Sequence, residues 1–271
     1  MNNTNKTKNL ALSTPRDPRF MGNRPASRAT AGLHGMVVEK LGFLIASGEF
    51  KAGDILPNAT ELSARLSVGR SVLREGLKVL SGKGMIEARP KTGTRVRPRS
   101  EWNHLDPDLL AWRYIAPSAE DVGSIFDLRR AIEPAAATMC AKRADPEQIA
   151  RLNAILVEME LAADDSDRFA SPDLAFHQTL LRGTGNELIA SLASVVEMAL
   201  LISFRLSDDN YRGQRHSLPL HRAVVERIAA RDEDGARLAA IALLNDAEAD
   251  VRNVLDRRGR TPPKKPMDAV R

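Results

Sequence analysis

Apolar residues recur every three or four positions along most of the chain, which is the spacing of helices that bury one face. In the first third this spacing predicts three short helices over residues 34–46, 61–66 and 70–81. Two apolar stretches short enough for strands, 85–88 and 94–96, follow on either side of a glycine-bearing turn. Three helices and a two-stranded wing predict a winged helix-turn-helix unit.

Beyond residue 118 the pattern is helical throughout, and no alternating stretch of useful length follows Val96. Prolines and polar caps mark the expected helix starts, because both favour the first turn of a helix. They predict an all-α bundle of about six helices, which start near Ser118, Asp145, Ser171–Pro172, Asn186, Pro219 and Asp232 or Asp234. A single helix is expected from Asn186 to Leu206. The fold class is therefore mainly α, a winged helix-turn-helix followed by a helical bundle.

These elements predict five segments. Residues 1–30 form a disordered basic tail, 31–99 the winged unit, 100–117 a linker, 118–256 the helical domain and 257–271 a second disordered tail. In the linker, Pro107 is expected to interrupt regular structure, and Trp102 and Trp112 to pack at the junction of the two domains.

Charge is divided unequally along the 271 residues. Residues 1–99 carry 18 Lys and Arg against 7 Asp and Glu, or +11, and residues 100–251 carry 15 against 26, or −11. Residues 252–271 add 7 against 2, which completes the net charge of +5. A basic end beside an acidic body indicates a module that binds a polyanion.

Several classes of protein are not expected. The longest apolar stretch, residues 191–203, is interrupted by Glu197 and is too short to span a membrane, and the N-terminus lacks the apolar core of a secretory signal. With Cys140 as its single cysteine, the chain can form no internal disulfide. We therefore expect a cytoplasmic protein without membrane contact.

The third helix and the wing carry the candidate DNA contacts. Arg70 and Arg74 are four residues apart on one helical face, with Ser71 beside them, and an arginine fork can bond guanine O6 and N7 together. The wing tip, Lys91, Thr92 and Gly93, suits phosphate or minor-groove contacts. Arg65 on the second helix is a weaker phosphate candidate. The plainer alternative is that these arginines form only a solvated helix face.

The segment from Ile45 to Val96 resembles the DNA-binding domain of the GntR superfamily of bacterial regulators. It matches the family's Leu-Pro, Glu-Leu and Arg-Glu-x-Leu elements and its glycine-bearing wing, and departs from the pattern at Ala52, Gly69 and Gly76. The resemblance implies binding of double-stranded DNA by a homodimer on a pseudo-palindromic operator. The Trp-Asn-x-Leu-Asp-x-Asp element after the wing is similar to the linker of regulators that respond to sugar acids such as D-galactonate.

In the helical domain, three side chains have the character of metal ligands. Asp173 and His177 lie four residues apart and so share a helix face, while His221 lies on a later helix. A carboxylate and imidazoles from facing helices can hold Zn²⁺, Ni²⁺ or Mn²⁺. An Asp-x-x-x-His pair is more often a surface pair or a hydrogen-bonded core pair than a metal site, so this alternative stays open.

This domain resembles the FCD-type effector domain of the FadR branch of the superfamily. The matching segments are Asp127–Pro134, Asp173–Asn186 and His221–Ile228. The resemblance implies a divalent metal held by one Asp and three His, but the fourth position falls at Leu243, which cannot be a ligand. An Asp/two-His site with positions left for water or effector is what the resemblance implies here.

An open metal position suits a hydroxy-carboxylate or sugar-acid effector. Arg129 is the candidate carboxylate clamp, with a salt bridge to Glu133 as the equal alternative. Asn186 and Ser217 are further effector candidates, although both residue types also cap helices. We expect a repressor of sugar-acid catabolism genes that such an effector releases from DNA. The alternatives are a metal-dependent enzyme or a metal sensor that uses Asp173, His177 and His221.

Overall fold

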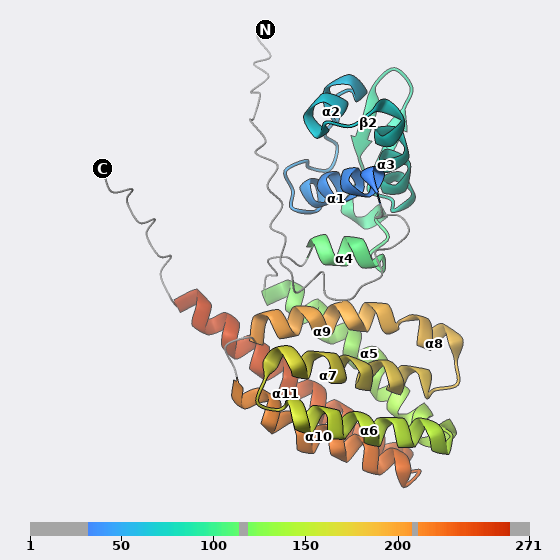
Figure 1. Cartoon of the computed structure of the whole chain (residues 1–271), viewed down its shortest axis with the longest axis vertical. Coiled ribbons are helices and arrows are strands. Elements are labelled where there is room, and N and C mark those ends of the chain that lie inside the picture. The colour runs from blue at the N-terminus through green and yellow to red at the C-terminus, as the bar shows by residue number, and fades with distance from the viewer. Residues whose placement is uncertain (1–31, 114–118, 208–210, 261–271) are drawn as a thin grey trace. The chain divides into compact units, whose positions relative to one another are not determined.

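The computed structural model describes residues 32–113, 119–207 and 211–260. Contacts divide the chain into two compact units, Met1–Arg113 and Tyr114–Arg271 (Figure 1). Each unit is described by itself. None of the helices within the described ranges is both long and apolar enough to cross a membrane. The expected tail over 1–30 lies outside these ranges, as does Ser118, the expected cap of the first helix of the bundle.

The first unit contains the expected three helices and wing. The helices are α1 (Leu33–Ala46), α2 (Ala59–Leu66) and α3 (Arg70–Gly82), and the wing strands are β1 (Ile86–Arg89) and β2 (Gly93–Val96). The strands pair antiparallel, with Ile86 opposite Val96 and Arg89 opposite Gly93. Asn58 caps α2 by accepting a hydrogen bond from the Glu61 backbone N–H.

The segment after the wing differs from the expected linker. A 3₁₀ turn, η2 (Arg99–Glu101), is followed by α4 (Pro107–Arg113), so Pro107 begins a helix rather than interrupting one. Proline suits that position because the first helical N–H has no intrahelical partner in any case. Trp102 and Trp112, 7% and 8% exposed, belong to the core of the first unit together with the apolar faces of α1 and α3.

Two features hold α4 on this core. The Lys83 ammonium lies 2.7 Å from Asp106 Oδ2 and 2.9 Å from Asp108 Oδ2, and all three side chains are largely buried. Gly42 leaves room for the Trp112 ring, because a Cβ atom at residue 42 would lie 2.3 Å from Cζ3 of that ring. The residues up to Arg113 are therefore packed as part of the winged unit.

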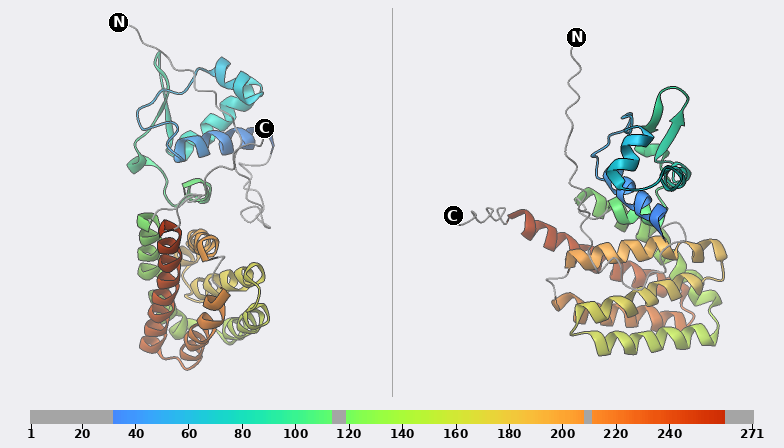
Figure 2. Two further views of the ribbon diagram at one scale, coloured as in Figure 1. Left: turned by 90° about the vertical axis from the view of Figure 1, so that its left-hand side faces the viewer. Right: turned by 45° about the horizontal axis from the view of Figure 1, so that its top comes forward.

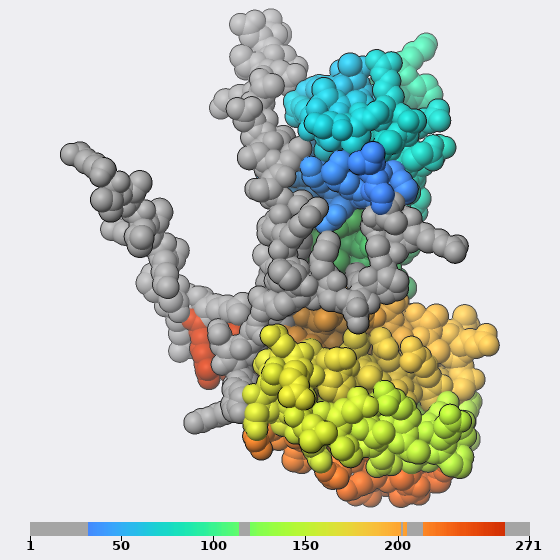
Figure 3. Space-filling view, in the orientation of Figure 1, coloured from blue at the N-terminus to red at the C-terminus, as the bar shows by residue number. Residues whose placement is uncertain are grey.

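The second unit is a bundle of long helices that lie side by side in both views of Figure 2. The described helices are α5 (Ala119–Arg143), α6 (Pro146–Ala162), α7 (Ser166–Arg182), α8 (Glu187–Ser191), α9 (Ala193–Ser207), α10 (Tyr211–Ala229) and α11 (Glu233–Arg260). On the face seen in Figure 3, α6 and α7 lie at the front of this unit, with α8 and α9 along one edge and α10 along the other. Within the described residues the regular elements are helices and one two-stranded sheet, so the expected mainly-α fold class is confirmed.

Several expected helix limits were wrong. Pro172 and Pro219 lie inside α7 and α10, which begin at Ser166 and Tyr211. A proline removes one backbone donor, but buried neighbours such as Phe169 keep α7 intact on both sides of it. α5 likewise contains Pro134. The last helix reaches Arg260, so residues 257–260 are helical and not part of a tail.

The helix expected from Asn186 to Leu206 is two helices. α8 ends at Ser191, and α9 begins at Ala193. The Ser191 hydroxyl donates to the Leu188 carbonyl at 2.7 Å, a local bond that competes with continuation of the helix.

Candidate functional site

The candidate DNA-binding surface is the N-terminal part of α3. Arg70, Ser71 and Arg74 are all exposed there, as their spacing predicts. The Arg70 Nη2 atom donates to Thr60 Oγ1 of α2 at 3.2 Å, while the Arg74 side chain is 74% exposed and has Glu75 Oε1 3.7 Å from its Nε. Both guanidinium groups can therefore reach a partner outside the protein.

Glu75 is the acidic member of this face. Its hydrogen bond with Lys78, together with the charges of Lys78 and Arg74, lowers the pKa of Glu75. It therefore stays ionised, and it moderates the positive charge that α3 presents.

The wing tip presents Lys91, Thr92 and Gly93 on an exposed turn between β1 and β2. Lys91 and Gly93 have φ values of 65° and 94°, in the left-handed region that glycine adopts without strain. Arg65 on α2 forms an ion pair with Glu61 one turn away. Among the arginines predicted to contact DNA, Arg65 has the closest ion pair within the protein.

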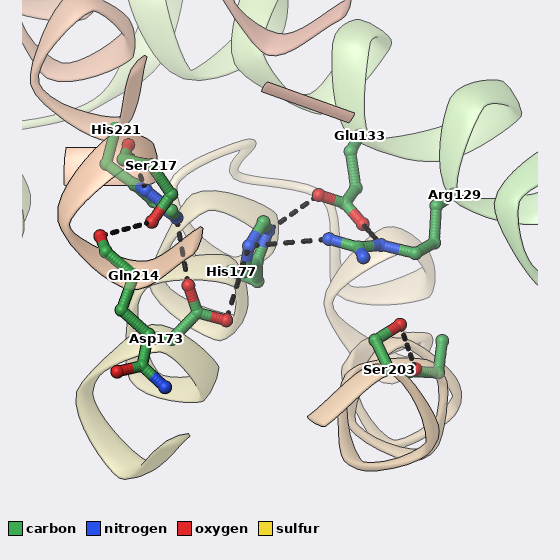
Figure 4. A network of polar contacts seen from close by, with 9 residues as sticks. Arg129, Glu133, Asp173, His177, Ser203, Gln214, Ser217 and His221 are labelled. Atoms are coloured by element: carbon green, nitrogen blue, oxygen red, sulfur yellow. Dashed lines mark hydrogen bonds and ion pairs between the residues drawn. The ribbon is translucent and has the colours of Figure 1, made fainter. Parts of the chain in front are cut away.

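The metal-ligand candidates of the second unit come together in its interior (Figure 4). Asp173 and His177 on α7 and His221 on α10 are all buried, and each offers a ligand atom within 4.8 Å of the others. His221 Nε2 lies 2.9 Å from Asp173 Oδ1, and His177 Nε2 lies 3.8 Å from Asp173 Oδ2. Residues from two separate helices, α7 and α10, thus form one cluster of three potential ligands.

Contacts outside the cluster indicate which imidazole nitrogens face inward. His221 Nδ1 lies 2.9 Å from the Ser217 carbonyl, which can only accept, so Nδ1 carries the proton of the neutral ring. His177 Nδ1 lies 2.6 Å from Glu133 Oε2. Both rings then turn the lone pair of Nε2 toward Asp173, the arrangement found in carboxylate–histidine–metal sites.

The donor set fits a divalent cation. His221 Nε2 is buried without a well-aligned hydrogen bond, and it faces a carboxylate oxygen that is also an acceptor. Such a pair is stable only with a second proton on the ring or with a cation between the two atoms. Burial raises the pKa of Asp173, but the neighbouring His221, His177 and Arg129 outweigh burial and lower the pKa, so the carboxylate is ionised as a metal ligand must be.

Arg129 and Glu133 form a buried ion pair beside the cluster. Arg129 Nε lies 2.7 Å from Glu133 Oε1, and each side chain is 2% exposed. Burial raises the pKa of Glu133, yet the charges of Arg129 and His177 lower it to about 2. Arg129 Nη2 also lies 3.4 Å from His177 Nε2. The salt bridge that the sequence left open is therefore present.

A cavity of about 90 Å³ opens beside the cluster, well above the roughly 10–15 Å³ that one water molecule needs. Arg129 and Ser217 line it together with the three cluster residues, and so does Leu243. Asn186 does not line it. Its side chain accepts from the Leu188 N–H and caps α8, which is the plainer of the two roles that the sequence allowed.

The sequence did not point to two residues of this site. Glu133 was considered only as a partner of Arg129, although it also orients His177. Gln214, which lines the cavity from α10, was not considered at all because its helix was expected to begin at Pro219. The Arg-x-x-x-Glu spacing was the available signal for Glu133; for Gln214 there was none.

A winged helix-turn-helix in one unit, and a buried Asp/His cluster beside a cavity in the helical unit, are features of a DNA-binding regulator. Comparison with known families supports this class. Residues 33–96 match the bacterial regulatory proteins of the gntR family, and residues 124–246 match the FCD domain.

Relatives of similar length are also regulators of transcription. The chain is 34% identical over 224 residues to the uncharacterized HTH-type transcriptional regulator YieP of Escherichia coli K12, covering 81% of this chain and 96% of YieP. It is 27% identical over 215 residues to the galactonate operon transcriptional repressor of the same organism, covering 77% and 92%. A solved structure of Lar, which controls the agr system of Listeria monocytogenes, shares the fold at a TM-score of 0.60 and 16% identity, covering 82% and 97%.

The chain belongs to the GntR family of transcriptional regulators and carries an FCD domain. The predicted family is thereby confirmed. Because the family and these relatives are regulators of transcription, the chain is not an enzyme, as predicted, and the metal-dependent enzyme is not favoured.

Proposed function

We propose that this protein is a homodimeric repressor of sugar-acid catabolism genes that a small hydroxy-carboxylate releases from its operator. One observation carries the proposal, namely the buried Asp173, His177 and His221 cluster that opens, beside Arg129, onto a cavity in a DNA-binding regulator. The galactonate operon repressor among the relatives supports the sugar-acid class. The protein acts in the cytoplasm, where its operator lies.

In this proposal α3 enters the major groove, and Arg70, Ser71 and Arg74 contact base edges and nearby phosphates. Lys91, Thr92 and Gly93 of the wing, and more weakly Arg65, contact the DNA backbone. Two copies of α3 in a homodimer meet the two halves of a pseudo-palindromic operator. A modest change in their spacing or orientation therefore weakens binding to both halves together.

The net charge of the proposed effector site depends on whether a metal ion is bound. Arg129 carries one positive charge against the two negative charges of Glu133 and Asp173, so with neutral histidines the site has a net charge of −1. A divalent cation held by Asp173, His177 and His221 changes this to +1. Zn²⁺, Ni²⁺ or Mn²⁺ would supply a Lewis acid for the carboxylate and hydroxyl oxygens of an effector.

The protein's own groups then orient the effector. Arg129 is positioned by Glu133 and borders the cavity, so its guanidinium can donate to a bound carboxylate. The Ser217 hydroxyl donates to the Gln214 carbonyl at 2.9 Å, and its oxygen remains an acceptor at the cavity wall.

The test begins with a thermal-shift screen of aldonic, uronic and hydroxy acids, with and without Zn²⁺, because a ligand that binds the folded state raises the unfolding temperature. Each acid that binds is then added to the protein bound to a fluorescent operator selected from random DNA. We expect release of the DNA, measured as a fall in anisotropy. Equal operator affinity with and without every acid tested would contradict the proposal.

Arg74→Ala tests the DNA contact itself. We expect operator affinity to fall by about 1–3 kcal/mol, the value of a good base contact, with no change in thermal unfolding. Arg237→Ala, an exposed arginine of α11, is the matched control and should bind the operator as tightly as the unmodified protein.

The metal sensor is the second candidate, and the buried three-ligand cluster favours it. It is separated from the first by a chelator. If the metal itself is the effector, adding or removing Zn²⁺ changes operator affinity without any acid present. If an acid is the effector, metal alone leaves operator affinity unchanged.

A further inference from the structure

The residues that line the cavity beside the Asp173, His177 and His221 cluster are spread along α10 from Gln214 to His221. Ser166 contacts Gln214, and Asp173 contacts His221, so the same seven-residue step separates the two contacts on both helices. At a rise of 1.5 Å per residue this step is about 10 Å. Since Gln214 and His221 both line the cavity, it extends roughly two helical turns away from the cluster.

Gln214 marks the end of the cavity that is distant from the cluster. The residue is 9% exposed, and its Nε2 donates to Ser166 Oγ. Its Oε1 atom is buried and has no hydrogen-bond partner among the described residues. A buried amide oxygen is costly to leave unpaired, so a group that enters the cavity and donates a hydrogen bond would bind there.

Two carboxylates besides Asp173 are among the described residues that line the same cavity. They are Asp246 and Asp250 of α11, and Asp246 Oδ1 lies 3.1 Å from His216 Nε2. The walls between the two ends are apolar, with Phe169, Leu200 and Phe204 among the residues that line them. The cavity therefore has one end suited to a carboxylate and another suited to a donor.

We propose that Gln214 binds the distal hydroxyl of an effector that carries its carboxylate at the metal and Arg129 end. The carboxylate end rests on the proposed function, while the distal contact rests on Gln214 itself. The ligand class is a polyhydroxylated monocarboxylate about as long as the cavity. A dicarboxylate of the same length is rejected, because its second carboxylate would face the Gln214 oxygen and Asp246.

Three six-carbon acids test the proposal by titration calorimetry on the full-length protein with Zn²⁺ present. Gluconate has a carboxylate and hydroxyls, hexanoate has a carboxylate alone, and adipate has a carboxylate at each end. We expect gluconate to bind most tightly and adipate most weakly. In Gln214→Leu the affinity for gluconate falls about tenfold, the value of one hydrogen bond, while that for hexanoate is unchanged.

Two further variants keep the result interpretable. Gln214→Glu retains an acceptor of the same size and should keep gluconate binding while rejecting adipate more strongly. Gln178 donates to Glu197 on α9 and is not one of the residues that line the cavity, so Gln178→Leu should bind all three acids normally. Glycerate is too short to span the cavity, so its affinity should be the same in every variant of residue 214.

Several results would overturn the inference. They are an unchanged gluconate-to-hexanoate ratio in Gln214→Leu, adipate binding as tightly as gluconate, or no binding of any of the acids. Operator affinity is measured on the same samples. Gln214-dependent gluconate binding that leaves operator affinity unchanged would contradict the proposed release from DNA and leave this inference standing.

Discussion

At the scale of single residues, Glu133 illustrates how one buried carboxylate can serve two neighbours. One oxygen lies 2.7 Å from Arg129 Nε and the other 2.6 Å from His177 Nδ1. The first contact compensates a buried guanidinium, and the second sets the orientation of an imidazole. Removing the charge is therefore expected to affect both the proposed carboxylate clamp and the proposed metal site.

Glu133→Gln is expected to weaken Zn²⁺ binding about 10- to 100-fold, the usual effect of losing a partner that orients a ligand histidine. The change keeps the size of the side chain but removes the charge that holds His177 in place. Competition with a fluorescent zinc chelator measures the affinity. Glu158→Gln, an exposed glutamate paired with Arg151, is the control, and an equal loss in both variants would refute the role.

Residue types and spacing were enough to find Asp173, His177 and His221, because helical periodicity places i and i+4 on one face. They were not enough to find the second contact of Glu133. That contact depends on the tilt of α5 against α7, which no pattern within a single helix contains. Gln214 was missed for a related reason. Pro219 suggested that the helix starts there, but in the structure α10 begins at Tyr211 and continues through the proline.

At the scale of elements, α4 is part of the winged unit, and the surroundings of Lys83 explain why. Burial lowers the pKa of Lys83, but its hydrogen bonds to Asp106 and Asp108 outweigh burial and raise it. The contribution to stability is therefore complete below the unfolded pKa of about 10.4 and is lost as pH rises through the higher folded value.

Lys83→Met is expected to destabilise the winged unit by about 3 kcal/mol at pH 7, because two part-buried carboxylates lose their partner. Urea unfolding at pH 7 and at increasing alkaline pH measures the difference, which should shrink above about pH 10.4. Lys78→Met, an exposed lysine of α3 paired with Glu75, is the control and should change stability by less than about 1 kcal/mol.

Gly42→Ala tests the contact between α1 and α4. Helix propensity alone would favour alanine by about 1 kcal/mol, but the new Cβ would overlap the Trp112 ring, and overpacking costs about 1–3 kcal/mol. We expect a lower unfolding temperature and altered tryptophan fluorescence. Gly82→Ala, where a Cβ meets nothing within 4 Å, should be neutral or stabilising. Greater stability in Gly42→Ala would show that α4 does not pack as described.

The helices of both units were largely predictable because each buries one face, but their junctions were not. The sequence placed the end of the winged unit at residue 99, since Pro107 and the acidic residues around it read as a turn. In the structure Asp106 accepts from the backbone N–H groups of Asp108 and Leu109, so the same residues begin α4. The expected interruption at Pro107 was therefore wrong, because the same residues cap and begin a helix.

At the scale of the whole molecule, the two kinds of proposed binding differ in their sensitivity to salt. The basic segment over residues 1–99 carries +11, and DNA binding by such a segment releases counterions. The effector cavity lies among side chains that are mostly buried, where dissolved ions screen much less.

Raising KCl from about 50 to 200 mM should weaken operator binding by orders of magnitude while changing gluconate affinity little. Anisotropy and calorimetry at matched salt concentrations measure the two. A steep salt dependence of gluconate binding would indicate an exposed site, and would place the acid somewhere other than the cavity lined by Arg129.

α5, α7 and α10 each contain a proline close to a residue of the site. Pro134 follows Glu133, Pro172 precedes Asp173, and Pro219 lies two residues before His221. Each proline removes one hydrogen bond from its helix, and a helix bends most easily where such a bond is missing. A ligand that contacts Asp173 and His221 in the cavity therefore acts on α7 and α10 close to the points where these two helices bend most easily.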